Sequence, residues 1–296
     1  MIFLKVSLHT INRDGLKSDF CNHLIAIFLF FCVTMNSMLK TKRIFFTVSL
    51  FLILLFAANA EAANLGELVN FNINKDFDSS ARSEVEAIMV KSTQNLYFYV
   101  EKKWWDLQPL QKQWEVLNTL DLLSLEFNNK IYPTLTSVFG SEWKPGVDGD
   151  NKITVFFHAM KEDVGGYFES GDEYITLQVP TSNEREMLYL SLGIVDNLNN
   201  LKVLLAHEFV HLITFNQKDR LQEVAEEIWL NEVRADFAST ILGYDVAYEG
   251  SNLQARVRDF LQNPADSLTE WQETKSDYAV ASVFMHYMVD HYGISV

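Results

Sequence analysis

The pattern of apolar residues along the chain predicts both helices and strands, with most of the helices in the second half. Between residues 114 and 132 they recur at helical intervals, at Leu117, Leu120, Leu123 and Phe127, which predicts a helix there. The apolar, proline-free run 204–213 also predicts a helix. Another is expected from Trp229 to Leu242-Gly243, where the glycine can end it in the left-handed conformation. Residues 253–261 and 277–292, on either side of Pro264, are predicted as the last two helices.

Short runs of aromatic and β-branched residues predict strands over residues 95–100, 153–157 and 174–179. The segment 148–151 could offer oxygen ligands to calcium, but it lacks the remaining positions of a calcium loop. We therefore interpret it as a turn into the second strand, and His158, which follows that strand, as a structural residue. This order predicts an α+β fold, with a mixed sheet before the helix 204–213 and a mainly helical C-terminal lobe after it.

The helix predicted over 204–213 carries a His-Glu-x-x-His motif formed by His207, Glu208 and His211. Residues four apart lie one turn apart on the same helix face, so both imidazoles can bind one zinc ion. Glu208 can then serve as the general base that takes a proton from zinc-activated water and passes one to the leaving amine. The alternative is a buried amphipathic helix with two hydrogen-bonded histidines.

A second acidic pair, Glu232 and Asp236, lies on the next predicted helix. A catalytic zinc ion needs three protein ligands and one open position, and we expect Glu232 to be the third ligand. Asp236 shares its helix face and could accept the second ring N–H of His207, fixing its tautomer. Taken alone, the pair could equally be an ordinary acidic helix face.

These motifs resemble the gluzincin zinc metallopeptidases of the thermolysin-like clan, and most closely the hyicolysin-like secreted bacterial peptidases. The similarity covers roughly residues 90–293, and the sequences Glu-Arg-Glu-Met-Leu-Tyr-Leu at 184–190, Ala-His-Glu-Phe-Val-His-Leu at 206–212 and Trp-Leu-Asn-Glu at 229–232 carry it. Val233 departs from the family pattern, which usually has glycine there. The resemblance implies a zincin-like fold and a strand before the zinc helix along which substrate lies, a role we assign to residues 174–179, although a core strand is the alternative.

The same resemblance implies a tyrosine that stabilises the oxyanion forming on the scissile carbonyl. Tyr278, at the start of the last predicted helix, matches that position. The alternative for Tyr278 is a packed residue, and His286 and His291 are lower-ranked candidate donors.

Composition and the N-terminal pattern indicate an exported protein. Residues 1–60 hold six of the 24 basic and two of the 39 acidic residues, so residues 61–296 carry a net charge of −19. This charge argues against nucleic acid and anionic membranes as partners. Residues 38–60 have the basic start, apolar stretch and Ala-x-Ala end of a signal peptide, whose apolar part of about 13 residues is short for a membrane anchor. We interpret residues 1–37, which contain Cys21 and Cys32, as a mis-annotated extension, so the mature chain would lack cysteine.

The sequence thus predicts a secreted or periplasmic zinc metalloendopeptidase that acts on peptide or protein substrates, without a membrane anchor after signal cleavage. Its parts would be residues 61–195, the N-terminal α+β part, and residues 196–296, the zinc-binding helices and C-terminal lobe. The chain stops soon after its last predicted helix, which leaves open whether part of that lobe is missing. One alternative is a secreted binding or adhesion protein without catalytic turnover. Another is an aminopeptidase, for which Glu184 or Glu186 would have to hold the substrate amine.

Overall fold

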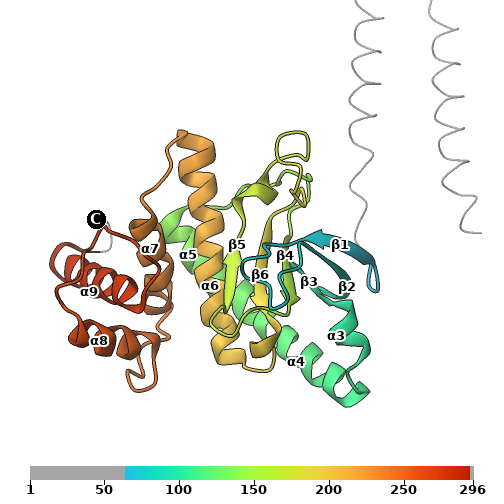
Figure 1. The fold of residues 1–296 in the computed structure, drawn as a ribbon, viewed down its shortest axis with the longest axis horizontal. Coiled ribbons are helices and arrows are strands. Elements are labelled where there is room, and N and C mark those ends of the chain that lie inside the picture. Colours follow the sequence, from blue (N-terminus) through green and yellow to red (C-terminus); the bar gives the residue numbers. More distant parts are fainter. Residues whose placement is uncertain (1–63, 294–296) are drawn as a thin grey trace, which may run out of the picture. The chain divides into compact units, whose positions relative to one another are not determined.

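A mixed β-sheet forms the first half of the structure, a computed structural model that describes residues 64–293 (Figure 1). Within these residues, six strands form one sheet in the order β1-β2-β3-β4-β6-β5. The strands β1 to β3 are antiparallel, β3, β4 and β6 are parallel, and β5 returns antiparallel to β6 at the edge. Their bounds are Leu68–Asn72, Glu84–Ser92, Leu96–Glu101, Ile153–His158, Gly166–Phe168 and Met187–Ser191 for β1 to β6 in turn.

The central strands β3, β4 and β6 are buried along their whole length, because both faces of the sheet are covered. Successive side chains of a strand point to opposite faces, and β3 shows this alternation. Leu96, Phe98 and Val100 pack into the core beneath the helices, whereas Tyr97 and Tyr99 pack into a second core on the opposite face. The sequence of β3 therefore reads as a continuous apolar run rather than an alternation of apolar and polar residues.

Helices cover one face of the sheet and form the C-terminal lobe (Figure 1). The α-helices are α3 (Lys102–Asp106), α4 (Leu110–Glu126), α5 (Tyr132–Phe139), α6 (Leu198–Thr214), α7 (Ile228–Ile241), α8 (Asn252–Gln262) and α9 (Lys275–Tyr292). Short 3₁₀ turns span Ser170–Glu173 and Leu192–Ile194, and π-helical turns span Phe127–Ile131 and Phe215–Arg220. The predicted α+β class, with a mixed sheet followed by a mainly helical region, is confirmed.

The predicted strand over residues 174–179 is wrong. These residues form turns, closed by hydrogen bonds such as that from Gln178 N to Ile175 O at 2.8 Å. The strand at this edge of the sheet is instead β5, and neither β5 nor β6 coincides with a predicted strand. Strands β1 and β2 were not predicted. The helix predicted over 114–132 begins at Leu110 and continues through a π-helical turn to Phe139.

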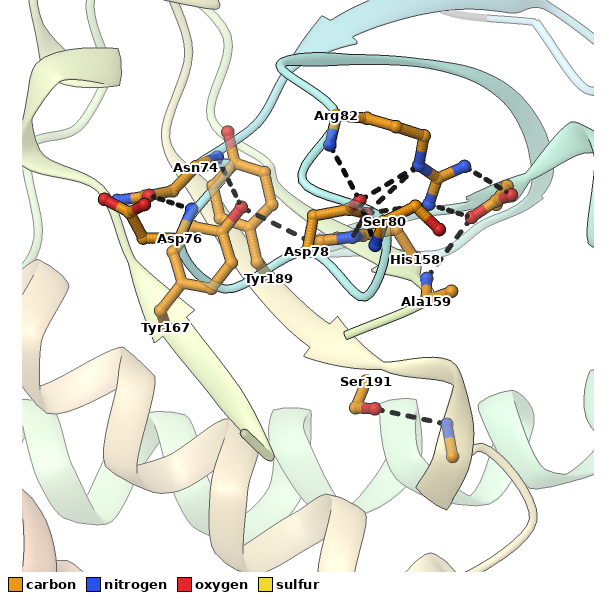
Figure 2. Close-up of polar contacts among 12 residues, drawn as sticks. Asn74, Asp76, Asp78, Ser80, Arg82, His158, Ala159, Tyr167, Tyr189 and Ser191 are labelled. Carbon is orange, nitrogen blue, oxygen red and sulfur yellow. Dashed lines mark hydrogen bonds and ion pairs between the residues drawn. The ribbon is translucent and has the colours of Figure 1, made fainter. Parts of the chain in front are cut away.

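A buried polar network ties the loop after β1 to the end of β4 (Figure 2). The Arg82 guanidinium donates to both Asp78 and Glu101, at distances from 2.7 to 3.2 Å. His158 lies between them and Tyr167, with Nδ1 3.4 Å from Asp78 Oδ2 and Nε2 3.3 Å from the Tyr167 hydroxyl. Burial lowers the pKa of His158, despite the nearby charge of Asp78. His158 is therefore a packed, hydrogen-bonded residue at the end of a core strand.

The predicted extension over residues 1–37 and the signal peptide over 38–60 lie outside the described residues. Within residues 64–293, no helix combines the length and the apolar character needed to cross a bilayer.

Candidate metal centre

Helix α6 presents the two histidines of the His-Glu-x-x-His motif to one point. Asn197 precedes the helix as its N-cap residue, and its side chain accepts a hydrogen bond from Asn200 N at 3.1 Å. Apolar side chains on its buried face fix its rotation against the sheet. One turn apart, the His207 and His211 Nε2 atoms lie 3.1 Å from each other.

Glu232 completes the group from α7, which packs along α6. Its Oε2 lies 3.5 Å from His207 Nε2, and its Oε1 lies 3.6 Å from His211 Nε2. A tetrahedral zinc ion with ligand distances of about 2.0–2.1 Å holds its ligand atoms roughly 3.3 Å apart, so the three side chains have the spacing that one such ion requires. Val233, the departure from the family pattern, is buried in the interior of α7, five residues after its start, and leaves the position of Glu232 intact.

The protonation of the two histidines also fits a cation site. Burial alone would lower the pKa of His207, but the hydrogen bond with Glu232 and the charge of Glu208 outweigh burial and raise it to about 9. Burial and the charge of His207 lower the pKa of His211 to about 4. Glu208 and Glu232 thus favour positive charge at His207, as they would favour the charge of a bound metal ion.

Glu208 lies beside the metal ligands and is 4% exposed. Burial raises its pKa to about 7, against the opposing charge of His207. A carboxyl with a pKa near the working pH can both take and return a proton. The edge strand lies directly on it, because a Cβ at Gly166 would be only 3.1 Å from Glu208 Oε1 and 2.8 Å from Tyr189 O. Glycine at 166 is therefore needed for this close approach.

Asn231 supports the second histidine and was not predicted. His211 Nδ1–H donates to Asn231 Oδ1 at 3.1 Å, which leaves Nε2 free to bind a metal ion. The only signal in the sequence is its place directly before Glu232.

The predicted hydrogen bond between Asp236 and His207 is absent among residues 64–293. The Asp236 carboxylate instead accepts bonds of 2.7 and 3.0 Å from Arg256, 2.9 Å from Asn252 and 2.7 Å from Ser282. An arginine offers a paired set of donors that fits both oxygens of a carboxylate, so Arg256 takes the place we had given to the histidine ring. Asp236 still contributes negative charge near His207.

Tyr278, in the first turn of α9, lines the same cleft as the three candidate ligands. Burial, followed by the charge of Glu232, raises the pKa of Tyr278 well above its usual range. The hydroxyl therefore stays protonated and can donate. The Arg256 guanidinium lies over its ring at 4.6 Å from the centroid, so α8 holds the tyrosine from one side. No local sequence motif marks Arg256.

All six predicted site residues line one cleft of about 1000 Å³. The edge strand β5 forms part of its wall, together with apolar side chains such as Leu204 and Phe215. An open strand edge can in general bind an extended peptide through main-chain hydrogen bonds. Residues 174–179 do not line this cleft, whereas Gly166, Tyr167 and Phe168 of β5 do.

The lower-ranked candidates lie elsewhere. His286 contacts Thr240 and Phe237 between α7 and α9, and His291 Nδ1 bonds with the backbone oxygen of Tyr287. Neither histidine lines the cleft, and neither do Glu184 and Glu186.

Searches of protein-family models and of curated proteins found no match to this chain.

Proposed function

We propose that the protein is a zinc-dependent metalloendopeptidase on a zincin-like fold, exported from the cell. The convergence of His207, His211 and Glu232 within ligand distance of one ion carries the proposal. Two imidazoles and one carboxylate are the ligand set of the catalytic zinc in thermolysin-type enzymes. Glu208 and Tyr278 supply the remaining chemistry beside these ligands.

The positions of these side chains support peptide hydrolysis in this cleft. Zinc, when bound, acts as a Lewis acid and makes water acidic enough to be deprotonated near neutral pH. Glu208 takes a proton from the attacking water as its oxygen bonds to the carbonyl carbon, and gives a proton to the amine as the C–N bond breaks. Tyr278 donates a hydrogen bond to the negative charge that forms on the carbonyl oxygen.

The cleft favours an endopeptidase over an aminopeptidase. An aminopeptidase needs an acidic group that holds the substrate amine. Neither candidate serves, because Glu184 bonds with Thr176 and Glu186 is buried next to Glu173. An extended peptide beside β5 needs no free terminus, so internal bonds would be cut.

The substitution Glu208→Gln tests the mechanism, because it keeps the shape of the base and removes its ability to take a proton. Activity on casein or a quenched peptide should fall by about 10³-fold, while mass spectrometry finds zinc bound as in the wild type. Glu115→Gln, on an exposed position of α4, should leave activity unchanged. Full activity in Glu208→Gln would refute the mechanism, and a wild type that binds zinc but cuts neither substrate would favour the binding-protein alternative.

A further inference from the structure

The turn between α3 and α4 exposes a group of large apolar side chains. Leu107 is 75% exposed, Leu110 is 83% exposed and Trp114 is 60% exposed. Figure 1 shows this turn at an outer corner of the ribbon, on the opposite side from α8 and α9. A group of apolar side chains that stays in water often marks a contact surface. We call residues 102–114, which form this turn and its flanks, the α3–α4 tip.

Two further tryptophans hold the tip against the rest of the molecule. Trp104 and Trp105 of α3 are partly buried and pack on the hydrophobic core beneath the helices. With Trp114, the tip therefore contains three of the six tryptophans in the chain. Because its base is packed on the core, the tip presents Leu107 and Leu110 from a fixed support.

The main chain of the tip is hydrogen-bonded by side chains of the tip itself. The side-chain amide of Gln108 donates to Trp104 O at 2.9 Å. The side-chain amide of Gln113 donates to Trp105 O and Gln108 O, at 3.1 and 3.3 Å. Carbonyl groups at the end of a helix are commonly left to water, but these three have protein donors, and Pro109 has no N–H group. The main chain of the turn therefore loses fewer hydrogen bonds when it leaves water.

The tip differs in charge from the acidic chain around it. Residues 102–114 contain three lysines and one aspartate, a net charge of 3 − 1 = +2, whereas the whole chain carries −15. Lys102 is paired with Asp106 within the tip. Lys112 is paired with Asp196 outside it. The tip can therefore approach phosphate groups without the repulsion that acts on the rest of the surface.

We propose that the α3–α4 tip docks the protein on a phospholipid bilayer with zwitterionic headgroups. Tryptophan rings favour the headgroup level of a membrane, and leucine side chains beside them enter the boundary of the acyl chains. The apolar side chains drive this binding, because the overall negative charge of the chain opposes anionic lipid. No residue of the tip lines the cleft of the proposed zinc site, so docking and hydrolysis use different residues.

A protein partner is the competing occupant, and the small extent of the tip argues against it. Specific protein interfaces use roughly 20–30 residues on each side. Asp121, paired with Lys91, lies between the tip and the next exposed leucines of α4, Leu122 and Leu125. A few apolar side chains at a corner of the molecule suit insertion into a lipid layer better than they suit a broad protein interface.

Sedimentation with lipid vesicles tests the proposal. The purified full chain is mixed with sucrose-loaded phosphatidylcholine vesicles, and the bound fraction is measured as the lipid concentration rises. We expect the wild type to bind and Leu110→Asp to bind at least about tenfold more weakly. Leu177→Asp is the matched control, because Leu177 is 88% exposed in a different turn, and it should bind like the wild type. Added phosphatidylglycerol should not strengthen binding.

A second variant and a second probe support this test. If Leu110→Asp fails to fold, Leu107→Asp should weaken binding in the same way. With vesicles of brominated phosphatidylcholine, the tryptophan fluorescence of the wild type should be quenched, and Trp114→Phe should lose part of that quenching. Activity on a short dissolved peptide should be the same in Leu110→Asp and the wild type, so the tip and the proposed zinc site are tested separately.

Four results would overturn the proposal. The first is a wild type that does not bind phosphatidylcholine vesicles, and the second is binding that requires anionic lipid. The third is equal loss of binding in Leu110→Asp and Leu177→Asp, which would place the contact elsewhere. The fourth is a wild-type dimer that Leu110→Asp converts into a monomer, because a second copy of the chain would then cover the tip.

Discussion

Helix α6 and the pair α8–α9 face the same cleft but are anchored in different ways. Ten of the 17 residues of α6 are buried, including Phe209 and both neighbours of His211. In the described chain, α8 has no buried residue, and the buried residues of α9 are small or polar: Asp277, Ala279, Ala281 and Ser282. The metal ligands of α6 are thus placed by the hydrophobic core, whereas Tyr278 and Arg256 are placed mainly by polar contacts.

Asp236 is the centre of those polar contacts. From α7 it binds Asn252 and Arg256 of α8 and Ser282 of α9, so one carboxylate joins three helices. A capping box between Thr274 and Asp277 fixes where α9 begins. Polar bonds specify geometry but contribute little net stability each. The contrast teaches that the position of the candidate metal ligands depends on the core, whereas the position of Tyr278, the proposed oxyanion donor, depends on a polar network that can be loosened separately.

The largest expected effect comes from removing core packing under α6. Phe209 is fully buried, with its ring 5.1 Å from that of Phe127 and stacked on Tyr132. Phe209→Ala should lower the free energy of unfolding by about 3–5 kcal/mol, measured by denaturant titration. Phe284→Ala, on α9 where the ring is 37% exposed, should cost about 1 kcal/mol or less. Equal losses in the two variants would remove the contrast between the helices.

Local spacing explains which parts of the site could be predicted from sequence. His207 and His211 lie on one helix face, and Glu232 follows on the next helix, so their meeting depends on two adjacent elements. Tyr278 was predicted from family resemblance, and it lines the same cleft as Glu232. Asp236 was assigned to the right site but the wrong partner. Its partner Arg256 lies 20 residues later in the sequence, on α8, a helix that carries no recognisable motif.

The sheet shows the same limit. Strands β3 and β4 are long apolar runs and were predicted nearly to their bounds. Strand β5 has only three residues, which is too short to show a periodic pattern of apolar positions. Residues 174–179 have the apolar composition of a strand, but Ile175 and Leu177 are exposed in the structure.

Tyr278→Phe tests whether the lobe contributes to catalysis without contributing to metal binding. Removing one oxyanion donor should lower kcat about 10²-fold, with KM nearly unchanged, because the bond forms mainly in the transition state. Zinc affinity should remain that of the wild type, since Tyr278 is not among the ligands. Tyr287→Phe, half exposed on the same helix, is the matched control. If kcat were unchanged in Tyr278→Phe, the hydroxyl would have no catalytic role and Tyr278 would serve only in packing.

The smallest expected effect is that of loosening the network around Asp236. Ser282→Ala removes one buried hydrogen bond of 2.7 Å to the carboxylate and should lower the free energy of unfolding by about 1 kcal/mol. Ser276→Ala, one helix turn and a half earlier, loses only a 3.4 Å contact with Asn263 and should change it by less than about 0.5 kcal/mol. Because Asp236 keeps its bonds with Arg256, zinc binding should persist while kcat falls by a few-fold at most. Loss of zinc in Ser282→Ala would show that the lobe and the metal ligands are one unit rather than two.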